Sequence, residues 1–132
     1  MRVLLAFEDK YRAYMEAMAA ALRTFCSDVE AALTDGRNLE AELERFDPQL
    51  LISSPPLPDN PVDKELVARI ELSPEPTQAS SFRVGERRWE STNPTLGEIL
   101  PVVDETKRLF RMTGPGLVGT PVTTRLYYSL FG

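Results

Sequence analysis

Residues 2–34 read RVLLAFEDKYRAYMEAMAAALRTFCSDVEAALT, and this stretch decides the fold class. It opens with a short apolar run at 2–7, which is typical of a strand covered on both faces of a sheet. Large apolar side chains then recur at steps of three and four, as they do along one face of a helix. We expect this helical stripe to pack on the sheet: Tyr11, Met15, Met18, Leu22 and Phe25.

A second strand–helix–strand unit follows from the end of the first. Val29, Ala31 and Leu33 alternate with Asp28 and Glu30, which is consistent with a second strand, and the turn signal TDGRN comes next. We expect a short helix with Asn38 as its N-cap and Pro48 as its stop, and then a third strand at PQLLIS. Two such units in succession imply an α/β fold whose strands are parallel.

The pattern changes after residue 54. PPLPDNPVDK carries four prolines and cannot be a regular helix, whereas ELVARIELS alternates like a half-exposed strand. SSFRVGERRWES predicts an antiparallel hairpin over about 81–91, with Gly85-Glu86 as a type II′ turn. NPTLGEILPVVDETKRLFRMTGPG predicts the last helix, in which Thr95 and Glu98 have the spacing of a capping box.

Composition narrows the class of function. The chain has 132 residues, 15 basic and 20 acidic side chains and a net charge of −5, which argues against a nucleic-acid partner. It contains no histidine, so the commonest general base and zinc ligand are missing. The single cysteine, Cys26, excludes an intrachain disulfide and is expected to be a small buried side chain. No stretch has the length of a signal peptide or membrane span, so we expect a cytoplasmic protein without membrane contact.

Three motifs together resemble the receiver (response-regulator, CheY-like) domain of bacterial two-component signalling. The acidic pair Glu8-Asp9 follows the first strand, as the acidic pair of that family does. FDPQLLISSPPLP stands where the family has a Pro-Asp pair, a strand, the phosphoryl-accepting aspartate and an apolar-Pro ending. NPTLGEIL stands where the family has a Lys-Pro pair and its last helix. The resemblance covers residues 1–58 and 91–113.

The resemblance implies a flavodoxin-like three-layer sandwich with a mostly parallel five-stranded sheet. Few residues separate Ser54 from Ser73, and the hairpin-like segment 80–91 stands where the family has its fourth helix, so we expect the third and fourth helices to be reduced or absent. Residues 1–113 would form the receiver-like domain. Residues 114–132 would form an apolar tail that adds a strand or binds a partner.

The resemblance also places a degenerate receiver pocket at Glu8, Asp9, Ser54, Ser73 and Asn93. Ser54 falls on the phospho-acceptor, Ser73 on the hydroxyl switch residue and Asn93 on the lysine. A serine needs an adjacent base where the family uses a carboxylate with a divalent cation, so we expect no phosphoryl transfer and no enzyme activity. We also expect no cofactor and no metal. Weak magnesium binding at Glu8 and Asp9 is the alternative to a role of these acids at a helix start.

These expectations point to a non-phosphorylatable pseudo-receiver that acts as an interaction or regulatory module in bacterial signalling. Its partner would be another protein or a second copy, with a homodimer formed through the C-terminal tail. The alternative is a small-molecule or metal-binding sensor, or a minor enzyme, that uses the strand-end cleft around Glu8, Asp9, Ser54 and Ser73. The side chains expected to contact a partner are Arg87, Arg88, Trp89, Tyr127, Tyr128 and Phe131.

Overall fold

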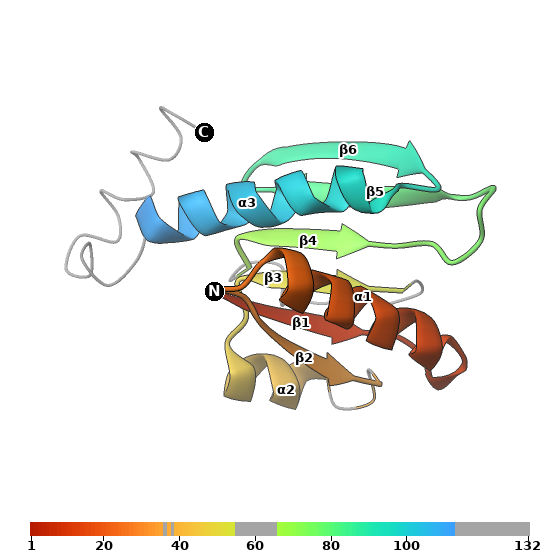
Figure 1. Ribbon diagram of the computed structural model, residues 1–132, viewed down its shortest axis with the longest axis horizontal. Helices are drawn as coiled ribbons and strands as arrows, with labels where there is room; N and C mark the ends of the chain where they lie inside the picture. Colours follow the sequence, from red (N-terminus) through yellow and green to blue (C-terminus); the bar gives the residue numbers. More distant parts are fainter. Residues whose placement is uncertain (36, 38, 55–65, 113–132) are drawn as a thin grey trace.

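The computed structural model describes residues 1–35, 37, 39–54 and 66–112, which form an α/β fold with a mixed sheet (Figure 1). The strands are β1 (Arg2–Ala6), β2 (Glu30–Thr34), β3 (Leu50–Ser53), β4 (Ala68–Glu71), β5 (Ala79–Val84) and β6 (Arg87–Thr92). The helices are α1 (Arg12–Phe25), α2 (Leu39–Phe46) and α3 (Leu96–Met112), with a 3-10 turn η1 (Asp9–Tyr11) before α1.

The sheet has the strand order β2-β1-β3-β4-β5-β6. Its first four strands are parallel, as expected, whereas β5 pairs antiparallel with β4 and with β6. The expectation of a mostly parallel sheet of five strands is therefore wrong. The cause is the connection over residues 72–78, which holds no helix and is too short for the crossover that a parallel neighbour needs.

The predicted hairpin is confirmed as β5 and β6, with Val84 paired to Arg87 across the turn. Gly85 has a φ of +59° at the first central position, where a type II′ turn requires a residue that accepts positive φ. The absence of a fourth helix is confirmed over residues 72–78. The expected loss of the third helix falls on residues 55–65 and the expected tail on 114–132, and both lie outside the described residues.

The helices form a layer on each face of the sheet. α1 and α3 share one face, where they cover alternate residues of the strands, and α2 packs on the other face through Leu39, Leu43 and Phe46 (Figure 1). Met15, Met18 and Leu22 are buried as the stripe predicted. Phe25 is 64% exposed, so its place in that stripe is wrong. α1 ends at Phe25, and the next residue, Cys26, turns into the core instead.

Polar contacts fix both ends of α3. At its start, a Glu98 carboxylate oxygen accepts the backbone N–H of Thr95 at 2.8 Å, which is one half of the expected capping box. Near its end, Nζ of Lys107 donates to Oδ1 of Asp28 at 2.8 Å. None of the helices in the described ranges has the length and hydropathy that crossing a bilayer requires.

Candidate functional site

The carboxyl ends of β1, β3 and β4 lie at one edge of the sheet, toward the right in Figure 1. Open α/β sheets bind ligands at this edge. Glu8 and Asp9 follow β1, Ser54 follows β3 and Ser73 follows β4. The expected pocket residues of these three strands are therefore placed at one edge, and we call this set the strand-end site.

Ser54 lies between the ends of β1 and β3 and is only 3% exposed. Its backbone N–H donates to the carbonyl of Ala6 at 3.2 Å, which prolongs the pairing of the two strands by one step. Its Oγ accepts the backbone N–H of Glu8 at 3.4 Å. The structure thus brings Ser54 and Glu8 together, and the serine hydroxyl satisfies the loop backbone.

The two acids of the strand-end site each lie beside a basic side chain. Oε2 of Glu8 is 3.6 Å from Nζ of Lys10, and Oδ2 of Asp9 is 3.0 Å from Nη2 of Arg37. Tyr11 and then Glu8 raise the pKa of the Lys10 ammonium. Across the described ranges, no group of three or more Cys, Asp or Glu residues is arranged to hold a metal ion.

Ser73 is engaged within the loop that joins β4 to β5. Its backbone N–H donates to Oγ of Ser80 at 2.9 Å, and its Oγ accepts the N–H of Glu75 at 3.2 Å. A third contact joins Oγ of Ser73 to Oε1 of Gln78 at 3.4 Å. These contacts hold the loop over residues 72–78 between neighbouring antiparallel strands, as serine side chains often do.

Asn93 lies apart from the other residues of the strand-end site. It follows β6, and the sheet order puts β4 and β5 between that strand and β3. Three strand spacings of about 4.8 Å separate β6 from β3 by about 14 Å, so Asn93 does not stand beside Ser54. Its φ of 50° instead identifies it as the residue that turns the chain from β6 toward α3.

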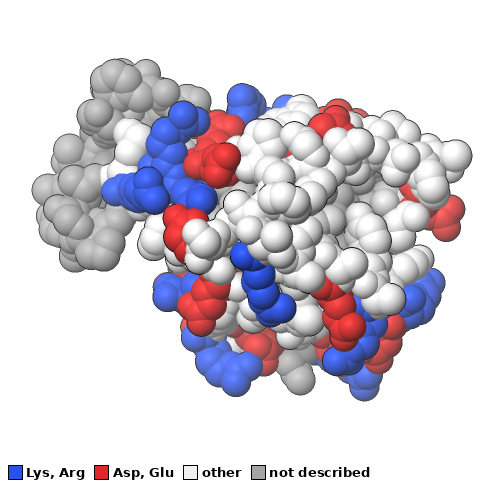
Figure 2. All heavy atoms as spheres, in the orientation of Figure 1, with Lys and Arg blue, Asp and Glu red and all other residues white. Residues whose placement is uncertain are grey.

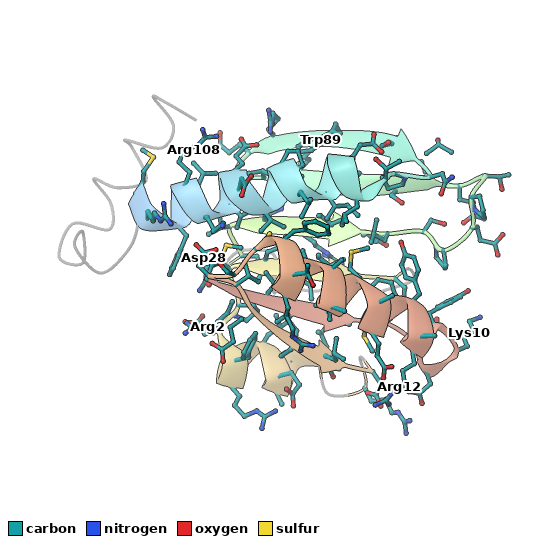
Figure 3. The ribbon with its side chains drawn as sticks, viewed as in Figure 1. Arg2, Lys10, Arg12, Asp28, Trp89 and Arg108 are labelled. Atoms are coloured by element: carbon teal, nitrogen blue, oxygen red, sulfur yellow. The ribbon has the colours of Figure 1, made fainter. Side chains whose placement is uncertain are left out.

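The expected partner-binding residues of β6 divide between the two faces of the sheet. Trp89 stacks on Phe82 at 5.2 Å between ring centroids and 7° between planes, on the α3 side (Figure 3). The guanidinium of Arg87 lies 4.7 Å from the Trp89 ring centroid and pairs with Glu105 of α3. Arg88 is exposed and, by strand alternation, faces the opposite side. Tyr127, Tyr128 and Phe131 lie outside the described residues.

The pairing of β4, β5 and β6 aligns two rows of side chains on the sheet face opposite α3. The arginine row consists of Arg69, Arg83 and Arg88, which are direct cross-strand neighbours. The acidic row beside it consists of Glu71, Ser81 and Glu90. The pairing of positions 83 and 88 follows from the turn at Gly85-Glu86, so this part of the arginine row was readable from the sequence. Position 69 could be added only once the register of β4 was known.

Charge on the visible side of the molecule is mixed. Figure 2 shows basic and acidic side chains interspersed with uncharged surface on the face that bears α1 and α3. Cys26 is buried under this face, and burial raises the pKa of its thiol, which disfavours the reactive thiolate.

No protein-family model, curated protein or solved structure matches this chain. The receiver resemblance therefore depends on the quoted motifs, beside an α/β sheet compatible with a flavodoxin-like fold.

Proposed function

We propose that this chain is a non-catalytic interaction module, a pseudo-receiver of bacterial signalling that works in the cytoplasm by binding another protein or a second copy of itself. The observation that carries the proposal is the state of the strand-end site. The hydroxyl of Ser54 accepts a backbone N–H, and the carboxylates of Glu8 and Asp9 lie beside Lys10 and Arg37. Each of these three side chains thus already has a contact within the chain.

Phosphoryl transfer to a receiver requires three groups at one place. These are a carboxylate nucleophile, acids that hold a divalent cation, and a cation that pairs with the transferred phosphoryl oxygens. Here Ser54 stands at the position of the nucleophile, and Asn93 follows β6 at a distance of about 14 Å from β3. A serine hydroxyl needs a general base to be a good nucleophile at neutral pH, and this chain has no histidine to serve as one. Both departures support a module whose output does not depend on its own phosphorylation.

The partner in this proposal is a protein. The net charge of −5 and the mixed charges in Figure 2 disfavour nucleic acid. The exposed edge of the hairpin, with Arg88 and Glu90, offers charged side chains and a strand backbone that no described residue pairs, of the kind that strand addition uses. The C-terminal tail with Tyr127, Tyr128 and Phe131 remains part of the proposal as a further contact.

The test is incubation of the chain with acetyl phosphate and magnesium, followed by intact-mass measurement. We expect no stable gain of one phosphoryl group, while a phosphorylatable receiver treated in parallel gains one. A stable gain at Ser54 or Asp9 would overturn the proposal. Thermal unfolding with and without magnesium is the companion measurement, since a magnesium-dependent rise in the midpoint would favour the sensor alternative.

A further inference from the structure

β6 is the last strand of the sheet, and no described residue pairs with its outer side. The direction of its backbone groups follows from the hairpin. A two-residue turn makes the flanking pair, Val84 and Arg87, a hydrogen-bonded pair, and the pairs beyond it alternate. The N–H and C=O groups of Arg88 and Glu90 therefore point outward from β5. At these two residues β6 thus presents an edge that the described part of the chain does not pair.

The charged side chains on the edge of β6 favour a partner strand with complementary charges. Arg88 and Glu90 are both exposed, and neither has an ion-pair partner among the described residues. Arg88 stands directly opposite Arg83, and like charges in cross-strand pairs are unfavourable. A partner strand that brings a carboxylate beside Arg88 and a cation beside Glu90 would form an opposite-charge contact at each position. Strand β6 of a second copy carries both groups at the required spacing.

We propose that two copies of this chain pair β6 with β6, antiparallel, around a two-fold axis at Trp89. In this register Arg88 stands opposite the partner's Glu90, and Glu90 stands opposite the partner's Arg88. Both pairs use the outward backbone groups, so each is a hydrogen-bonded pair with an opposite-charge side-chain contact. Trp89 meets the partner's Trp89 as a non-hydrogen-bonded pair on the α3 side. The two sheets become one continuous sheet.

Alternative registers of the same two strands are unfavourable. A slip of two residues in one direction sets Arg88 against the partner's Arg88. A slip in the other direction sets Glu90 against the partner's Glu90. A slip of one residue would match outward backbone groups with inward ones and break the ladder. The charges on β6 therefore select a single register.

The rows behind β6 strengthen this selection. With the axis at Trp89, the arginine row of one protomer continues into the acidic row of its partner, and the reverse holds on the other side of the axis. The cross-strand order becomes Arg69, Arg83, Arg88 and then the partner's Glu90, the partner's Ser81 and the partner's Glu71. Two rows that each gather one sign of charge within a protomer thus become complementary between protomers.

This inference deepens the proposed function by naming the partner and the surface, and it rests on that function only for the role of the contact. Trp89 marks the dimer edge in Figure 3, whereas Lys10 marks the strand-end site at a distant corner of the molecule. Association is measured without reference to the strand-end site. A failure of dimerisation and a gain of phosphoryl on Ser54 are therefore separate results.

Light scattering after size-exclusion chromatography tests the proposal on the full chain. We expect a two-chain mass for the wild type and a one-chain mass, at the same concentration, for Arg88→Glu and for Glu90→Arg. Each single variant sets like charges against each other on both sides of the axis. An equimolar mixture of the two variants restores both opposite-charge pairs, so we expect the two-chain mass to return. The matched control is the charge swap Arg12→Glu with Glu16→Arg on α1, which alters an exposed pair away from β6 and leaves the mass unchanged.

Amide hydrogen exchange provides a second measurement that needs no variant. The N–H groups of Arg88 and Glu90 should be protected at high chain concentration and exchange quickly on dilution, while the N–H of Trp89, bonded to β5, stays protected at both. A monomeric wild type would overturn the proposal, including the case in which the chain's own C-terminal segment occupies the edge. A dimer whose mass ignores both charge reversals, or a mixture that stays monomeric, would overturn the register.

Discussion

At the scale of the residue, Asn93 shows how one side chain can match a family motif and yet do something else. It precedes Pro94 as the lysine of the receiver motif precedes its proline. Its φ of 50° is left-handed, a conformation that costs most residues free energy and that asparagine tolerates. The residue type at this position is explained by the turn between β6 and α3.

Replacing Asn93 tests this explanation. Asn93→Val should lower the free energy of unfolding by about 1–2 kcal/mol, because a β-branched residue is strained at positive φ. Asn93→Gly should leave stability nearly unchanged, since glycine adopts this conformation without a steric penalty. Urea unfolding of the three chains gives the comparison. Equal losses in both variants would mean that the amide side chain, and not the backbone, is what matters.

The same residues show how far the sequence could predict the site. The proximity of Glu8 and Ser54 was predictable, because β1 and β3 are parallel neighbours and their ends meet at one edge. The distance of Asn93 was not, because it depends on how many strands lie between β3 and β6. Aligning the receiver motifs along the sequence does not show how many strands separate them in the sheet. Phe25 was placed wrongly because a helical stripe can continue three or four residues after Leu22, and Cys26 takes the buried position.

At the scale of the element, α3 is held at its carboxyl end by Asp28. Lys107 keeps only 17% of its side chain exposed, and its ammonium donates to Asp28 at 2.8 Å. Arg111 adds a contact of 3.5 Å to the same carboxylate. The hydrogen bond lowers the pKa of Asp28 and raises the pKa of Lys107. The pair therefore couples the stability of α3 packing to pH.

The direction in which stability changes with pH follows from the directions of the Asp28 and Lys107 pKa shifts. An Asp with a lowered pKa adds stability above its unfolded pKa of about 3.9, and this contribution is lost as the pH falls through the folded value. Lys107→Met should therefore be less stable than the wild type at pH 7, and the difference should shrink at about pH 3. Urea midpoints at both pH values measure it. Arg108→Met, at an exposed position of the same helix with no ion-pair partner among the described residues, is the control (Figure 3). A difference that persists unchanged at low pH would mean that the stem of Lys107, rather than its charge, stabilises the helix.

The helices and strands were the part of the structure that the sequence predicted best. The hairpin and the first two strand–helix–strand units follow from local patterns of two and three to four residues, and the structure confirms them. The direction of β5 needed a further argument. Only the length of the connection over residues 72–78 decides between a parallel and an antiparallel neighbour, and the resemblance to a parallel fold concealed it.

At the scale of the whole molecule, the proposed dimer predicts a dependence on salt. Its two Arg88–Glu90 contacts are exposed, and exposed ion pairs are screened as ionic strength rises. We expect the dissociation constant to increase roughly fivefold between about 50 mM and about 500 mM sodium chloride. Sedimentation velocity over a range of concentrations measures it. An association that strengthens with salt would instead indicate an apolar interface, such as one formed by the C-terminal tail.

The open edge of β6 has a consequence for how far an assembly could grow. An exposed strand edge can recruit one chain after another and lead to aggregation. Pairing around a two-fold axis uses the same edge on both chains, so joining two copies consumes both β6 edges. The other edge of each sheet, β2, has a different sequence and does not carry the Arg88–Glu90 spacing. Assembly through β6 therefore stops at two copies. The charged residues that favour a second copy as the partner lie on the same edge that the dimer uses up.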